Sequence, residues 1–102
     1  MALLDLLGRR WALRILWELR DERPVTFRDL QARCGGVSSS VLNDRLRELR
    51  DAGIVGTEPV GGYRLSPDGR DLLEALAPLD VWAQRWATRL ANGPSLNSRT
   101  SV

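Results

Sequence analysis

Hydrophobic residues recur at helical spacing along most of this chain, and the pattern begins at its N-terminus. Leucines at positions 3, 4, 6 and 7 predict one or two turns of an apolar helix that ends near Gly8. In residues 9–20, a second stripe consists of Trp11, Ile15, Leu16 and Leu19. Pro24 stops this pattern and favours an extended loop. An apolar stripe on a helix is stable when another surface covers it, so we expect both of these stripes to pack against one.

Two shorter helices joined by a glycine turn are predicted next. Thr26 can cap the first of them, with Asp29 three residues later. Glycines at positions 35 and 36 allow the tight backbone that the end of this helix requires. Ser38 can cap the second helix, and Gly53 ends it. The predicted buried stripe of the second helix is Leu42, Leu46 and Leu49.

A hairpin and a long helix complete the pattern. Residues 54–55 and 63–65 predict two strands, with Gly61-Gly62 as a two-residue turn. The helix that starts after Ser66 has apolar residues at steps of four and three, which is typical of the seam of a helix pair. Pro78 is expected to kink this helix or break it in two. The seam consists of Leu72, Leu76, Leu79, Ala83, Trp86 and Leu90.

Composition narrows the class of protein. Residues 1–91 are predicted to form one small domain, and the polar residues 92–102 a disordered tail. A domain of this size buries only about 60–65% of its unfolded surface, so a second copy often covers the remainder. No apolar run reaches the roughly 18 residues of a membrane span, and no signal pattern opens the chain. With a single cysteine as well, we expect a cytoplasmic protein with no membrane partner.

The positive charges are all of one kind. The fifteen cationic side chains are arginines, and the net charge is only +2. A guanidinium group pairs with phosphates and with guanine edges through two parallel hydrogen bonds. Codon usage in a GC-rich genome explains the same bias, so the arginines alone do not decide the function.

Catalytic and metal-binding chemistry has few candidates in this sequence. The chain has no histidine, which excludes Ser-His-Asp, Cys-His and histidine-based metal sites. Neither glycine pair follows a strand and opens a helix, as a phosphate-binding loop does. Cys34 is either a redox sensor or a small packed residue. We expect no enzymatic activity and no cofactor.

The order helix, turn, helix, hairpin predicts a winged helix-turn-helix, a mainly α fold with a small β-hairpin that places one helix in a DNA major groove. Outside its buried stripe, the helix over residues 38–50 has a polar face, which is either a DNA contact or a solvated surface. The flanking elements favour DNA, although interleaved carboxylates leave this helix nearly neutral. The predicted base contacts are Ser39, Ser40, Asn43 and Arg47, with Ser38 and Arg50 beside them. The predicted phosphate contacts are Arg28, Arg45 and Arg64.

Two apolar surfaces remain for a second copy of the chain, the leucine-rich leader and the seam of the long helix. The predicted dimer interface is Leu3, Leu4, Leu7, Leu76, Leu79, Trp82, Trp86 and Leu90. Trp82 and Trp86 are alternatively plain core residues, or they line a small-molecule pocket at the seam for an effector that the sequence does not identify. Another alternative is a winged-helix protein-interaction module without DNA binding.

Four motifs occur in a fixed order over most of the chain. They are LLGRRWALRILWEL, TFRDL, GVSSSVLNDRLRELRDAGIV, and a P-x-x-x-Y-x-L-S-x-x-G pattern formed by Pro59, Tyr63, Leu65, Ser66 and Gly69. In this set the chain resembles the HxlR-type branch of the MarR-like winged-helix regulators of bacteria. The resemblance implies a cytoplasmic homodimer that binds pseudo-palindromic operators of double-stranded DNA and dimerises through its terminal helices. It favours a transcriptional regulator, and we expect a repressor.

Two departures from the family pattern affect the expected function. The family usually has a Cys-Pro pair upstream of the first helix, often its redox-sensing thiol, and this chain begins after that position. The predicted wing is shorter than usual and has no arginine at its tip. We therefore expect neither thiol sensing by that route nor strong minor-groove contact by the wing.

Overall fold

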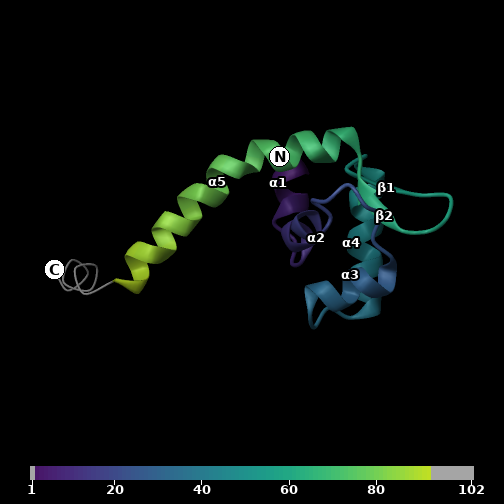
Figure 1. The fold of residues 1–102 in the computed structure, drawn as a ribbon, viewed down its shortest axis with the longest axis horizontal. Helices are drawn as coiled ribbons and strands as arrows, with labels where there is room; N and C mark the ends of the chain where they lie inside the picture. Colours follow the sequence, from purple (N-terminus) through teal and green to yellow (C-terminus); the bar gives the residue numbers. More distant parts are fainter. Residues whose placement is uncertain (1, 93–102) are drawn as a thin grey trace.

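The computed structural model describes residues 2–92, which form five helices and a two-stranded hairpin, arranged as in Figure 1. The predicted tail lies outside the described residues, apart from Asn92. The elements are, in order, α1 (Ala2–Leu7), α2 (Ala12–Glu18), α3 (Phe27–Cys34), α4 (Ser39–Asp51), β1 (Val55–Thr57), β2 (Tyr63–Leu65) and α5 (Pro67–Ala91). This arrangement confirms the predicted fold class, a mainly helical winged helix.

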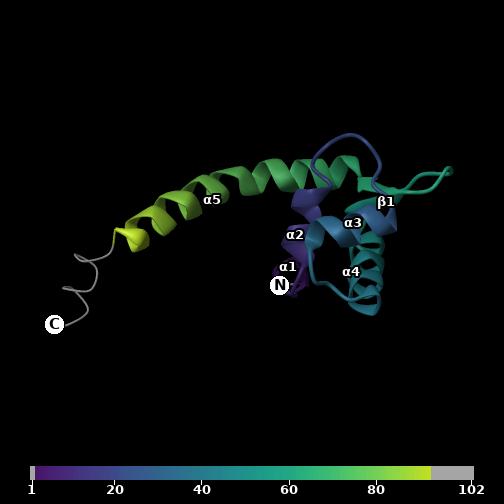
Figure 2. The ribbon, with the colours of Figure 1, turned by 60° about the horizontal axis from the view of Figure 1, so that its bottom comes forward.

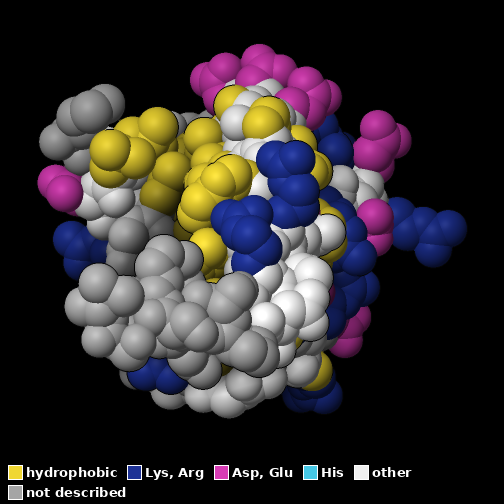
Figure 3. All heavy atoms as spheres, turned by 90° about the vertical axis from the view of Figure 1, so that its left-hand side faces the viewer, with side chains coloured by type: hydrophobic (Ala, Val, Ile, Leu, Met, Phe, Trp, Pro, Cys, Tyr) yellow, Lys and Arg dark blue, Asp and Glu magenta, His cyan; other side chains and the backbone are white. Residues whose placement is uncertain are grey.

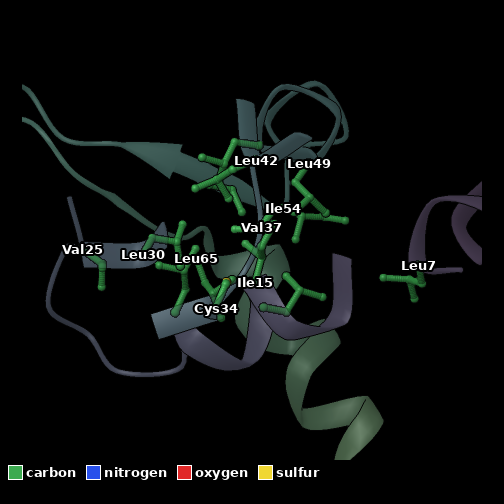
Figure 4. Close-up of a cluster of buried hydrophobic side chains, with 14 residues drawn as sticks. Leu7, Ile15, Val25, Leu30, Cys34, Val37, Leu42, Leu49, Ile54 and Leu65 are labelled. Carbon is green, nitrogen blue, oxygen red and sulfur yellow. The ribbon is translucent and has the colours of Figure 1, made fainter. Parts of the chain in front are cut away.

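One hydrophobic core holds α2, α3, α4 and the base of the hairpin together (Figure 4). Ile15 and Leu16 of α2 and Leu30 of α3 are fully buried in it. The buried stripe of α4 is the predicted one, Leu42, Leu46 and Leu49. Each fully buried leucine contributes about 1.5–3 kcal/mol relative to an exposed one. Packing of these stripes therefore fixes the outward face of α4.

The connection between α1 and α2 is longer than the sequence predicted. Instead of a helix over residues 9–20, α2 spans only Ala12–Glu18. Trp11, just before it, has φ 78°, in the left-handed region that is uncommon for a residue other than glycine. Its side chain is half-buried against the core, and this packing holds the backbone there. Leu7 of α1 is buried in the same core.

Three predicted helix starts are confirmed by the hydrogen bonds of their capping side chains. The Oγ1 of Thr26 accepts from the Asp29 amide at 3.1 Å, and the Oγ of Ser38 accepts from the Val41 amide at 3.2 Å. The Oγ of Ser66 does the same for α5. Each bond satisfies an amide that has no partner inside its own helix. At the end of α3, Gly35 adopts φ 62°, as a left-handed cap requires.

The tip of the hairpin differs from the prediction. β1 and β2 are antiparallel, with Val55 opposite Leu65. The carbonyl of Glu58 accepts from the Gly61 amide at 2.9 Å, so Pro59 and Val60 are the central residues of the turn. The predicted two-residue turn at Gly61-Gly62 is therefore wrong. Proline fixes its own φ near the value that the first central position needs, which favours the observed turn.

Helix α5 is continuous from Pro67 to Ala91, so the expected break at Pro78 does not occur. The helix curves along its length in Figure 1. Near its start, Leu72 and Leu73 pack against the core. Figures 1 and 2 both show its distal half projecting from the helical body, on the side opposite the hairpin loop. The molecule thus has a helical body, a short wing and a long helical arm.

Candidate nucleic-acid interface

The polar face of α4 is exposed as predicted. The helix buries Leu42, Leu46 and Leu49, one turn apart, and this leaves the opposite face to solvent. The exposed residues on it include Ser39, Ser40, Asn43, Arg47 and Arg50. Ser38 lies at the cap, with its hydroxyl engaged by the Val41 amide. The six side chains predicted to lie at or beside the bases thus follow one another along a single helix.

A hollow of about 430 Å³ lies between this face and the hairpin. Tyr63 of β2 forms one wall, although its sequence context predicted a strand and a motif position for it and no place in the DNA contacts. The alternation of β2, in which Tyr63 and Leu65 share a face, was the available signal. From α4 the lining residues are Ser40, Asn43, Asp44, Leu46, Arg47 and Arg50. Hydrogen-bonding groups of both α4 and the wing base therefore converge here.

Two of the predicted DNA contacts are paired with carboxylates. The guanidinium of Arg47 contacts Asp44 one turn earlier on α4. Arg64 on β2 contacts Glu58 across the hairpin at 2.5 Å. Both arginine side chains are more than half exposed, and exposed ion pairs contribute only about 0–1 kcal/mol. A phosphate or a base edge can therefore replace either carboxylate at small cost.

Arg45 has a different role from the predicted phosphate contact. Its side chain is only 17% exposed. The Nε atom donates to the carbonyl of Arg10 at 3.1 Å, and Nη1 contacts Glu48 at 2.5 Å. Arg45 thus joins α4 to the connection between α1 and α2, and we remove it from the DNA contacts. No local pattern predicts this role, because Arg10 lies 35 positions away.

The side chains of Arg28 and Arg50 are available to bind another molecule. Both side chains are exposed, and neither guanidinium group forms a hydrogen bond or an ion pair within the described range 2–92. Arg33, at the end of α3, donates instead to the carbonyl of Glu18 at 3.3 Å. Among the predicted phosphate contacts, Arg28 is therefore the cation with the fewest competing partners.

The predicted dimer residues divide into two groups. Leu7 is buried in the core of its own domain, so it is not available to a partner. Leu3, Leu4, Leu79, Trp82, Trp86 and Leu90 are between 41% and 60% exposed. Leu76 is half-buried. Figure 3 shows hydrophobic side chains gathered on the side of the molecule from which α5 projects.

An apolar groove of about 480 Å³ lies between α2 and α5. Leu13 and Trp17 line it from α2, and both are 47% exposed. Trp82 and Trp86 stack on each other with ring centroids 6.1 Å apart, but neither lines this groove. The groove is thus separate from the alternative pocket at these two tryptophans in a dimer seam, which stays a prediction.

Redox and metal chemistry receive little support from the described residues. Burial raises the pKa of the Cys34 thiol, the nearby charge of Glu18 raises it further, and Arg14 opposes both. The protonated thiol is a poor nucleophile, which favours the packed-residue interpretation. Within residues 2–92, no group of three or more His, Cys, Asp or Glu side chains is placed to hold a metal ion. None of the described helices has the length and apolarity to cross a membrane.

Comparison with known proteins agrees with this architecture. A model of HxlR-like helix-turn-helix proteins matches residues 6–91. The chain belongs to the HxlR-like helix-turn-helix family. It is 28% identical over 85 residues to the HTH-type transcriptional regulator BH0655 of Halalkalibacterium halodurans, covering 78% of this chain and 75% of the relative. The relatives of this HxlR-like chain are thus named as transcriptional regulators.

Two solved structures support the same assignment. A possible HxlR family transcriptional factor from Thermoplasma volcanium matches the HxlR-like chain with a TM-score of 0.75 and 27% identity, over 84% of this chain and 82% of that one. Quinone-bound YodB from Bacillus subtilis matches with the same score and identity, over 82% of this chain and 92% of that one. The fold is therefore the winged helix of HxlR-like regulators.

Proposed function

We propose that the protein is a dimeric, sequence-specific DNA-binding regulator that acts as a repressor in the cytoplasm. The observation that supports it most is the polar face of α4, which the buried stripe turns outward beside the wing. A helix presented in this way fits the major groove of B-DNA. Repression requires only that the dimer occupy its operator, and operators lie on the chromosome, in the cytoplasm.

The contacts divide by chemistry. Ser39, Ser40, Asn43 and Arg47 are proposed to meet base edges, because asparagine pairs with adenine, arginine with guanine, and serine with several edges. Arg28, Arg50 and Arg64 are proposed to hold the phosphate backbone. Arg47 would exchange Asp44 for a guanine when DNA binds. Tyr63 adds a further polar tip at the wing base.

The DNA contacts are tested by replacing Arg47. Arg47→Ala should weaken binding to a specific operator by about 1–3 kcal/mol, which is roughly fivefold to 150-fold. Arg47→Lys is the matched variant, since it keeps the charge but loses the planar fork. It should retain affinity for random DNA and lose affinity for the operator. Operator binding that neither variant weakens would remove Arg47 from the contacts.

A second copy of the chain is proposed to cover the arm of α5 and the groove beside it. The arm exposes Leu79, Trp82, Trp86 and Leu90, an apolar stripe that is costly to leave in water. Acidic and basic residues are also separated along α5. The first part of α5, residues 67–80, has four acidic residues and one arginine, whereas residues 81–91 have two arginines and no acid. Two such helices attract each other most strongly when they run antiparallel.

The positions of these charges fit one antiparallel register. Asp71 and Arg89 are each nine residues from Asp80, and Glu74 and Arg85 are six and five residues from it. A twofold axis near Asp80 would therefore bring Asp71 opposite Arg89 of the second copy, and Glu74 opposite Arg85. The eighteen residues between Asp71 and Arg89 are about five helical turns, so both lie on the same flank of the helix. Like flanks meet in an antiparallel pair, which supports these ion pairs.

A protein-interaction module is the competing function, and the paired charges of Arg47 and Arg64 are the observation that favours it. Salt dependence separates the two. DNA binding through six or more phosphates should weaken by about 10³-fold or more between 50 and 200 mM salt. If the protein binds operator DNA as weakly as random DNA, and binds both equally weakly at low and high salt, the protein-interaction module is favoured.

A further inference from the structure

A glutamine side chain spans the turn between α3 and α4. The Nε2 of Gln31 donates to the carbonyl of Val37 at 3.2 Å and to the Oγ of Ser39 at 3.1 Å. The backbone carbonyl of Gln31 accepts from the Gly35 amide at 3.2 Å. This one residue therefore contacts the end of α3, the turn and the first residue of α4.

The turn needs such a contact because its backbone is permissive. Gly35 and Gly36 both have positive φ, 62° and 104°, and glycine restricts these angles least. Val37 is buried and anchors the turn to the core through its side chain. Its carbonyl is held separately, by the Gln31 amide. The Val37 carbonyl thus has its partner in Gln31, whereas the direction of α4 is set by its buried stripe.

The bond to Ser39 also affects what that serine offers to another molecule. A hydroxyl has one hydrogen to donate and two lone pairs to accept with. The amide of Gln31 occupies a lone pair of Ser39, so the hydroxyl hydrogen stays available at the exposed surface. The hydroxyls of Ser38 and Ser40 are engaged differently from that of Ser39. The Ser38 hydroxyl caps α4 and lies 3.4 Å from the Ser40 hydroxyl, close enough for a hydrogen bond between the two.

We propose that Gln31 is a positioning residue that sets the base preference of Ser39. It holds the Ser39 hydroxyl as a donor toward acceptor edges, which are guanine N7 or O6, adenine N7 and thymine O4. The amino group of cytosine, a donor, is disfavoured at that position. The proposal rests on the proposed function, because Ser39 must lie in the major groove. Gln31 itself touches no base and acts through Ser39.

The test uses the full chain and an operator selected by the wild-type protein. Ser39→Ala identifies the base pair whose preference depends on Ser39. Gln31→Met has a similar shape but donates to neither partner, and should lower the preference at that same base pair by about tenfold, the order expected for one base contact. Gln31→Glu should have a similar effect, since its carboxylate accepts the Ser39 hydrogen and withdraws it from DNA. In Gln31→Met, which leaves the charge unchanged, affinity for random DNA and the salt slope should stay as in the wild type.

Glu22→Gln is the control, because Glu22 is exposed in the loop between α2 and α3, away from α4 and from the arm, and its side chain forms no hydrogen bond or ion pair within residues 2–92. It should leave the base preference unchanged. In the double variant Gln31→Met with Ser39→Ala, the preference should be no lower than in Ser39→Ala alone. Additive losses, or equal weakening on every DNA sequence, would show that Gln31 only stabilises the turn, and would overturn the proposal.

The free protein provides a readout that does not depend on DNA. Side-chain amide protons of Gln31, which has two acceptors, should exchange with water more slowly than those of the exposed Gln84. Equal exchange rates would show that the two hydrogen bonds of the Gln31 amide do not form in solution, and would overturn the proposal. A wild-type protein without sequence preference would instead overturn the proposed function, and with it the role of Gln31 at the bases. The two failures are therefore distinguishable.

Discussion

At the scale of single residues, the local contacts were the most predictable. Thr26 and Ser38 cap helices as the sequence predicted, because a cap and its amide lie three residues apart. Arg45 was not predictable, since its partner carbonyl at Arg10 is remote in the sequence. Leu7 illustrates the same limit. The spacing of the leucines predicts an apolar stripe, but it does not show which surface covers each of them.

Position 69, in the first turn of α5, is predicted to need a glycine because a larger residue does not fit there, and not because of its backbone conformation. A Cβ there would overlap the carbonyl oxygen of Ile54, at the base of the wing. An alanine inside a helix usually stabilises by about 1 kcal/mol relative to glycine. Here we expect Gly69→Ala to lower the free energy of unfolding by about 1–3 kcal/mol, the usual cost of overpacking. Urea denaturation measures it.

Gly56→Ala is the control for Gly69→Ala, because nothing lies within 4 Å of a Cβ at Gly56. The control should have a smaller effect on stability. If Gly69→Ala were as stable as the wild type, α5 would not approach Ile54 as closely as described.

Cys34 is predicted to make stability depend on pH in the alkaline range. Burial raises the pKa of this thiol above the ordinary 9.0 of the unfolded chain. The stabilising effect is complete below that value and is lost as the pH rises above it, because the unfolded state then releases its proton first. Between pH 8 and pH 10, the unfolding free energy should fall more in the wild type than in Cys34→Ala. Equal falls in the two proteins would contradict a buried, protonated thiol.

At the scale of elements, helix stripes and strands were predicted well and their connections less well. Periodicity identified the buried faces of α2 and α4, since burial of one face imposes it. The start of α2 was missed because Trp11 is held in a left-handed conformation by packing, which spacing does not reveal. The polar face of α4 was foreseen, but Tyr63 at its edge depends on how the hairpin folds back.

The wing is predicted to gain DNA affinity from one added cation. Its tip residue Val60 is 93% exposed and apolar, and Arg64 further down is paired with Glu58. If the wing lies beside DNA, Val60→Arg adds one phosphate contact, which should steepen the slope of log affinity against log salt by about 0.9. Fluorescence anisotropy with operator DNA measures this slope.

Val60→Gln is the matched control for the wing variant. It places a polar side chain without a charge at the same exposed position of the wing tip. This substitution should leave the salt slope unchanged. A slope that Val60→Arg does not alter would place the wing away from the DNA backbone.

At the scale of the whole molecule, the arm is the largest feature for which we propose a role that needs a second copy. We expect sedimentation at micromolar concentration to give a dimer of the 11.4 kDa chain. Replacing both Arg85 and Arg89 by glutamate should weaken the dimer by about tenfold to a hundredfold, because attraction to Asp71 and Glu74 becomes repulsion. A further exchange of Asp71 and Glu74 to arginine should restore it. Failure of that restoration would rule out the antiparallel register.

Two copies of α4 are proposed to bind one operator at a spacing set by the dimer. To test this, genomic fragments are selected with the purified protein and the bound fragment is footprinted. Such a dimer should protect two related half-sites in inverted orientation, with centres about 10–10.5 base pairs apart or a multiple of this, on one side of the duplex. No enriched sequence, or a single protected patch without a symmetric partner, would contradict it.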